Sequence, residues 1–201
     1  RWTEDRAAIA AELAETRGAT LIAPFENPYV IAGQGTTGLE AAEQAASLGA
    51  VMETLLVCCG GGGLTSGIAL AMEEASPQAK VHPVEPAGCD DVARSLAAGE
   101  RRANDPDARS ICDAIVTPTP GENTFAIMKR LCGPGVVVTD DQVRAAMRFA
   151  FTRLKLVVEP GGCVALAALL SGAVETKGRT IGIVLSGGNV DPALYGEILA
   201  G

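Results

Sequence analysis

The sequence has few aromatic side chains, a single histidine and no excess of positive charge. Aromatic residues make up 3% of its 201 residues, and 24 acidic residues outweigh 16 basic ones, giving a formal net charge of -8. Nucleic acids and anionic membranes bind basic surfaces, so this composition disfavours both as partners. We therefore expect the ligand to be a small molecule.

The sequence also lacks a run of about 20 apolar residues, so it predicts no transmembrane helix. It has no CxxC pair and no dense cysteine spacing of the kind found in disulfide scaffolds. Its six cysteines are Cys58, Cys59, Cys89, Cys112, Cys132 and Cys163. We expect reduced thiols in a cytoplasmic protein.

Hydrophobic periodicity predicts strands and helices in alternation. A first helix runs through Ala8, Ile9, Leu13 and Ala14 and is ended by Gly18. Further helices are predicted at residues 37–48, 64–74, 92–98, 125–132, 140–154 and 164–170 and at the C-terminus, and strands at 20–23, 54–58, 81–85, 114–117 and 180–185. Apolar strands separated by helices are typical of a parallel twisted sheet with helices on both faces. We therefore expect one α/β unit over residues 1–201.

Four glycines in a row follow the strand predicted at residues 54–58 and precede the next helix. They are Gly60, Gly61, Gly62 and Gly63. Such a turn presents bare N–H groups at the positive end of a helix dipole, which suits an anion such as phosphate. The sequence of this turn matches neither a GxGxxG dinucleotide fingerprint nor a P-loop. A tight turn without a ligand is the alternative interpretation.

A second glycine-rich turn, Ser186-Gly187-Gly188-Asn189, follows the last predicted strand. In a parallel sheet both turns lie at the carboxyl edge, where ligands bind in open α/β folds. Two loops could then face one ligand. Ser186 taken alone also fits an ordinary turn or cap residue.

Five motifs together resemble one known family. In chain order they are Gly33-Gln34-Gly35-Thr36, the glycine run at residues 60–63, Val84-Glu85-Pro86, Glu159-Pro160-Gly161-Gly162 and Ser186-Gly187-Gly188-Asn189-Val190-Asp191. This order resembles the fold-type-II enzymes that use pyridoxal 5'-phosphate (PLP), above all the serine/threonine dehydratases and serine racemase. The resemblance spans nearly the whole chain and implies a tryptophan synthase beta-like fold.

The resemblance also implies how PLP is held. The glycine run and the N–H of Leu64 would cradle the phosphate, Ser186 would hydrogen-bond the pyridine nitrogen, and Glu159 would lie near the ring. A neutral hydroxyl does not force the ring nitrogen to be protonated. The implied reaction is β-elimination of a hydroxy amino acid such as L-threonine or L-serine to a 2-keto acid and ammonia. For Glu159, an ordinary surface carboxylate before a helix is the alternative.

For Glu85, Cys89 and Asp91 the resemblance implies a divalent-cation site. Two carboxylates and the backbone carbonyl of Cys89 would be the ligands, and oxygen ligands suit Mg²⁺, Ca²⁺ or Mn²⁺. Without the resemblance, Asp90 and Asp91 are explained equally well as the acidic start of a helix.

Two family segments have no counterpart in the sequence. One carries the lysine that binds PLP covalently, in a pattern like Phe-Lys-x-Arg-Gly, and the other binds the substrate carboxylate. None of the lysines matches that pattern, and they are Lys80, Lys129, Lys155 and Lys177. We therefore expect this chain to be the C-terminal part of an enzyme that forms a homodimer. By itself, this part is expected to be inactive and to contain no catalytic residue. Two alternative functions stay open. One is a β-replacing enzyme similar to cysteine synthase, and the other is a non-catalytic module that holds a phosphorylated ligand.

Overall fold

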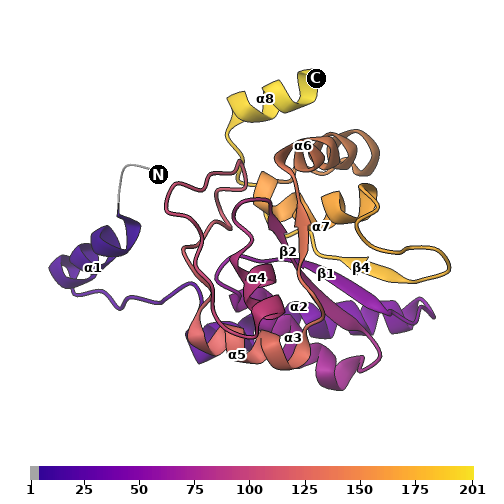
Figure 1. The fold of residues 1–201 in the computed structure, drawn as a ribbon, viewed down its shortest axis with the longest axis horizontal. Helices are drawn as coiled ribbons and strands as arrows, with labels where there is room; N and C mark the ends of the chain where they lie inside the picture. The colour runs from indigo at the N-terminus through magenta and orange to yellow at the C-terminus, as the bar shows by residue number, and fades with distance from the viewer. Residues whose placement is uncertain (1–4) are drawn as a thin grey trace.

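The computed structural model describes residues 5–201 as helices packed on both faces of a parallel sheet (Figure 1). In this part of the chain the sheet has four strands, in the order β3-β2-β1-β4. Their bounds are β1 Thr54–Cys58, β2 Lys80–Pro86, β3 Val136–Val138 and β4 Ile181–Ile183. Every strand pair is parallel, which confirms the expected α/β fold class.

Seven helices and one π-helical turn surround the sheet in residues 28–201. Their bounds are α2 Pro28–Ser47, α3 Gly63–Ala75, α4 Asp91–Ala98, α5 Glu122–Leu131, α6 Asp140–Phe149, η1 Ala150–Leu154, α7 Pro160–Leu170 and α8 Pro192–Ala200. Leu56 and Cys58 of β1 belong to the core shared with α6, α7 and α8, whereas Leu55 and Val57 belong to the core shared with α2 and α3. All residues of β1 are buried because both faces of the sheet are covered.

The first helix, α1 (Arg6–Arg17), lies apart from the sheet and buries none of its residues (Figure 1). Asp5 caps its start, and Gly18 ends it in the left-handed conformation that the sequence predicted. No helix in residues 5–201 combines the length and the apolar character needed to span a bilayer.

Two predicted strands are wrong. Residues 20–23 form no strand and are exposed, and residues 114–117 form an irregular loop. The edge position beside β2 is taken by β3, which the periodicity did not identify. In this loop Ile115 packs against the glycine turn and, with Ala114, against Gly161 of α7, so Ile115 belongs to the rim of the core on the α7 side. A short apolar run can be buried in this way as well as in a strand, so its periodicity does not distinguish the two.

Helix α2 begins nine residues earlier than predicted, at Pro28. Asn27 caps it by accepting the N–H groups of Tyr29 and Val30, and proline suits the first helical position. The glycines of this segment are therefore helical. A Cβ at Gly35 would lie 3.0 Å from the carbonyl oxygen of Gly67, so glycine here permits close contact between α2 and α3.

The other predicted elements are confirmed, the strand at residues 54–58 with the bounds of β1 and the rest with shifted ends. The helix predicted at residues 140–154 is α6 continued by the π-helical turn, which Lys155 ends with a φ of 63°. The strand predicted at residues 180–185 is the shorter β4.

We expect Gly67→Ala to lower the free energy of unfolding by roughly 1–3 kcal/mol, as overpacking does. A Cβ at Gly67 would overlap the carbonyl oxygen of Ile31 and lie 2.8 Å from the backbone nitrogen of Gly35. The matched control is Gly33→Ala, because no atom lies within 4 Å of a Cβ there. This control should gain about 0.5–1 kcal/mol, since alanine favours the helix. Urea unfolding measures both variants, and equal effects would contradict the close contact.

Candidate functional site

The glycine run forms the turn from β1 into α3. Gly62 has a φ of 93°, a left-handed conformation that glycine adopts without strain. Helix α3 starts at Gly63, and no side chain of the described residues caps it. The first N–H groups of a helix, here those of Gly63 and Leu64, have no intrahelical acceptor. Together with the helix dipole they suit an anion at this turn.

Neighbouring loops also explain part of the glycine content. A Cβ at Gly60 would lie 2.8 Å from the carbonyl oxygen of Ile115, and a Cβ at Gly61 would overlap the ring of Phe25. Packing therefore requires glycine at both positions, whether or not a ligand binds at the turn. Neither Phe25 nor Ile115 was predicted to contact the turn.

Thr124 bonds to the glycine turn and Glu26 supports Thr124, and neither was predicted to contact the turn. Thr124 Oγ1 donates to the carbonyl oxygen of Gly61 at 2.6 Å and lies 3.2 Å from the carboxylate of Glu26. That carboxylate accepts the N–H groups of Asn123 and Thr124 at the start of α5. Burial raises the pKa of Glu26, but these hydrogen bonds outweigh it and the pKa lies below its usual value. Glu26 itself has a φ of 68°, which is rare for a residue other than glycine.

The second glycine turn lies beside the first, as the parallel sheet predicted. Leu56 of β1 pairs with Ile183 of β4, and the N–H of Val184 donates to the carbonyl oxygen of Leu56. Two residues beyond Leu56, the Sγ of Cys58 is 3.2 Å from the Oγ of Ser186. The ends of two neighbouring strands thus bring the two turns together.

Glu159, the residue before α7, contacts the second turn. Its N–H donates to the carbonyl oxygen of Gly187 at 2.9 Å, and a Cβ at Gly187 would overlap its carboxylate. The pKa of Glu159 lies above its usual value, mainly because the side chain is partly buried. A hydrogen bond from the backbone N–H of Asn189 lowers this pKa, and the charge of Asp113 raises it. The structure therefore places Glu159 at the same edge of the sheet as Ser186.

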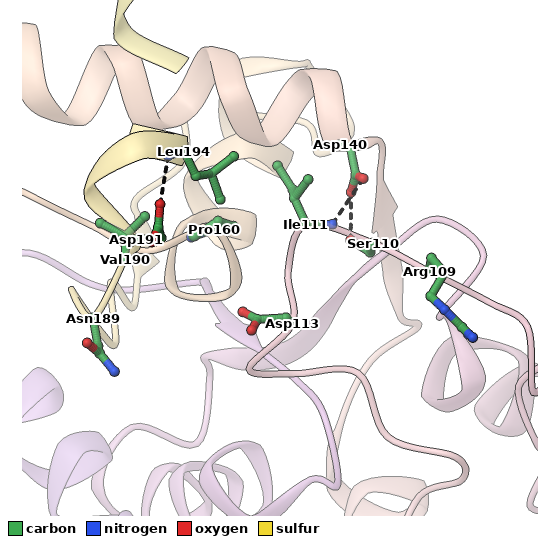
Figure 2. A pocket seen from close by; sticks show the side chains of 10 residues that line it. All are labelled: Arg109, Ser110, Ile111, Asp113, Asp140, Pro160, Asn189, Val190, Asp191 and Leu194. Carbon is green, nitrogen blue, oxygen red and sulfur yellow. Dashed lines mark hydrogen bonds between the residues drawn. The ribbon is translucent and has the colours of Figure 1, made fainter. Parts of the chain in front are cut away.

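A cavity of about 480 Å³ lies beside Pro160, the residue that follows Glu159, and its size suits a small molecule (Figure 2). On one side, the carboxylate of Asp140 accepts the hydroxyl of Ser110 at 2.6 Å and the N–H of Ile111 at 3.1 Å. The lining comes from the loop at residues 109–113, the starts of α6, α7 and α8, and the second turn, and consists of Arg109, Ser110, Ile111, Asp113, Asp140, Pro160, Asn189, Val190, Asp191 and Leu194. The cavity thus adjoins the second turn.

The carboxylates of Glu85 and Asp91 are both buried at the junction of β2 and α4. Glu85 accepts the N–H groups of Val92 at 3.0 Å and Ala93 at 2.7 Å. Burial raises the pKa of Glu85 to about 9, and the charge of Asp91 adds to the shift. Burial also raises the pKa of Asp91 to about 6, although a hydrogen bond from Asn104 opposes it.

The two carboxylate oxygens of Asp91 differ in their hydrogen-bond partners. Oδ1 accepts the side-chain amide of Asn104 at 2.6 Å, whereas Oδ2 is buried with no hydrogen-bond partner in the described residues. A buried acceptor of this kind beside a second carboxylate fits a cation, which would favour the charged forms of both groups.

Cys89 lies in the loop between these carboxylates and has a buried side chain. No group of three or more His, Cys, Asp or Glu side chains in residues 5–201 has the arrangement of a metal site. A cation held by Glu85 and Asp91 would therefore need backbone oxygens, such as the carbonyl of Cys89, among its ligands.

The fold and the paired glycine turns define an α/β protein whose sheet edge suits an anion and is flanked by a buried carboxylate pair. The chain belongs to the family described as pyridoxal-phosphate dependent enzymes, which matches residues 2–187. PLP is the cofactor of this family, and the uncapped start of α3 fits its phosphate group.

Curated relatives agree with this assignment. A serine racemase from Schizosaccharomyces pombe is 38% identical over 200 residues, and an L-threo-3-hydroxyaspartate ammonia-lyase from Saccharomyces cerevisiae is 41% identical over 202 residues. The match covers 100% of this chain and 60% of each relative, so the chain spans about three fifths of their length. Among solved structures, a threonine deaminase from T.th. has a TM-score of 0.85 and 41% identity, over 92% of this chain and 65% of that chain.

Proposed function

We propose that the complete protein is a PLP-dependent ammonia-lyase, which converts a hydroxy amino acid such as L-threonine or L-serine to a 2-keto acid and ammonia by β-elimination. The observation that carries the proposal is the neutral hydroxyl of Ser186, at 3.2 Å from Cys58 beside the glycine turn. The names of the ammonia-lyase and threonine deaminase relatives support it.

Each residue of the site has a role in this proposal. PLP, when bound, withdraws electrons from the substrate Cα and so makes its proton acidic. The N–H groups of the glycine run (Gly60–63) and of Leu64 hold the phosphate, Ser186 meets the pyridine nitrogen, and Glu159 lies beside the ring. Because Ser186 is neutral, it leaves the ring nitrogen unprotonated and limits electron withdrawal. A ring that withdraws fewer electrons would favour loss of the β-hydroxyl over transamination.

Racemisation of serine is the second candidate, because a relative that matches the whole chain is a serine racemase. The attachment lysine and the segment for the substrate carboxylate would lie outside these 201 residues. A cytoplasmic homodimer is part of the proposal. The free cysteines support the compartment, and the resemblance to the family supports the dimer.

The proposal includes a divalent cation, Mg²⁺, Ca²⁺ or Mn²⁺, held by the carboxylates of Glu85 and Asp91 and the carbonyl of Cys89. The buried and unpaired Oδ2 of Asp91 supports it. Such a cation would join the end of β2 to the start of α4 and so stabilise this edge of the sheet.

The complete protein with PLP should release ammonia and a 2-keto acid from at least one of L-serine, L-threonine and L-threo-3-hydroxyaspartate. Ser186→Asp should raise transamination relative to elimination, because a carboxylate partner favours a protonated ring nitrogen. Ammonia release is measured beside the absorbance of the pyridoxamine form, and chiral chromatography measures D-serine. Production of D-serine without ammonia would favour the racemase, and cysteine formation from O-acetylserine and sulfide would favour a β-replacing enzyme.

The 201-residue chain should bind PLP without a covalent bond. Three of its lysines donate to backbone carbonyls away from both turns: Lys80 to Leu131, Lys129 to Gly99 and Lys155 to Thr152. Equilibrium dialysis should therefore detect bound PLP, while borohydride reduction followed by intact mass measurement should find no adduct. A reduced PLP adduct at one defined lysine would contradict this prediction.

Added Mg²⁺ or Ca²⁺ should raise the melting temperature, because a ligand that binds only the folded state stabilises it. At a cation concentration 100 times the dissociation constant, the free energy of unfolding rises by about 2.7 kcal/mol. This corresponds to a rise in melting temperature of roughly 5–10 °C for a chain of this size. Asp91→Asn should abolish this rise. The control Asp90→Asn should keep it, since Asp90 pairs with Arg94 on the surface. An equal rise in all three proteins, measured by differential scanning calorimetry, would rule out the assigned ligands.

A further inference from the structure

Cys58 and Ser186 form a side-chain contact between the two glycine turns. The Sγ of Cys58, the last residue of β1, is 3.2 Å from the Oγ of Ser186. The cysteine is only 4% exposed. On another side, a Cβ at Gly162 of α7 would lie 3.3 Å from the same Oγ. The hydroxyl of Ser186 is therefore confined by β1 and by α7.

This hydrogen bond runs from the thiol of Cys58 to the oxygen of Ser186. Burial raises the pKa of the Cys58 thiol, so the thiol keeps its proton at neutral pH and can donate it. A serine hydroxyl has one proton to donate and two lone pairs that accept. When Cys58 donates to the oxygen of Ser186, the serine proton stays available for a second acceptor.

We propose that Cys58 is a positioning residue, whose thiol holds the oxygen of Ser186 so that the serine proton is donated to the pyridine nitrogen of PLP. The inference rests on the proposed function, which places that nitrogen at Ser186. A ring nitrogen that accepts this proton in a hydrogen bond stays unprotonated. Without the thiol, Ser186 can turn and accept a hydrogen bond from a protonated nitrogen instead, so Cys58 disfavours ring protonation.

Three variants separate hydrogen bonding from packing at this position. Cys58→Ser keeps a donor, Cys58→Ala removes it, and Cys58→Val removes it but fills more of the space. Equilibrium dialysis measures how tightly each binds PLP and 1-deaza-PLP, in which carbon replaces the ring nitrogen. The alanine and valine variants should bind PLP about two- to fivefold more weakly than wild type, as expected for one modest hydrogen bond. The serine variant should restore wild-type binding.

The deaza analogue is the decisive control, because it has no ring nitrogen to receive the serine proton. Its binding should be the same in wild type and in all three variants. Equal weakening of PLP and of the analogue would show that Cys58 acts through packing and would overturn the inference alone. If wild type bound neither compound, the proposed function would be wrong and the inference with it.

A second measurement needs no cofactor. The infrared S–H stretching band of Cys58 is identified as the band that Cys58→Ala removes. In Ser186→Ala this band should move to higher frequency, because the thiol has lost its acceptor. A band that does not move would overturn the inference, whatever the binding measurements give.

Discussion

The pairing of β4 with β1 is the constraint on which the candidate site depends. The register of Leu56 with Ile183 brings the second glycine turn beside the first, although the two are more than 120 residues apart in the chain. Because the strands are parallel, both turns leave the sheet at the same edge. The backbone hydrogen bond from Glu159 to Gly187 then attaches the start of α7 to this edge. Backbone pairing, more than side-chain contact, therefore assembles the site.

Glycine allows the segments around the site to approach closely. A Cβ at Gly162 would lie 2.8 Å from the backbone nitrogen of Gly187, and a Cβ at Gly60 would lie 2.8 Å from the carbonyl oxygen of Ile115. Any side chain at these positions would move a turn or a helix. The positions of the two turns are therefore coupled to the packing of the helices and loops around them.

The sequence predicted the parts of the fold that depend on local pattern. The continuous apolar run of β1, the glycine cap of α1 and the meeting of the two turns follow from local chemistry and from the geometry of parallel strands. The pattern failed where tertiary contact decides. Ile115 faces the glycine turn with its carbonyl oxygen and α7 with its side chain, and Glu26 meets Thr124 over a separation of 98 residues that no local motif encodes. By contrast, Glu85 and Asp91 were singled out because the resemblance to the family implied a cation site there, and the structure adds that both are buried.

Attraction of a phosphate to the site depends on short-range contacts, because the chain as a whole is acidic. With a formal net charge of -8, the long-range field repels a phosphate, but salt screens that field beyond about 8 Å at physiological ionic strength. A phosphate would therefore have to be attracted by groups at contact distance, and the N–H groups at the start of α3 suit this role. Burial raises the pKa of Cys59, next to the glycine turn, and the negative charge of Glu85 raises it further. A cation between Glu85 and Asp91 would reduce the repulsion between the two carboxylates and so favour their charged forms.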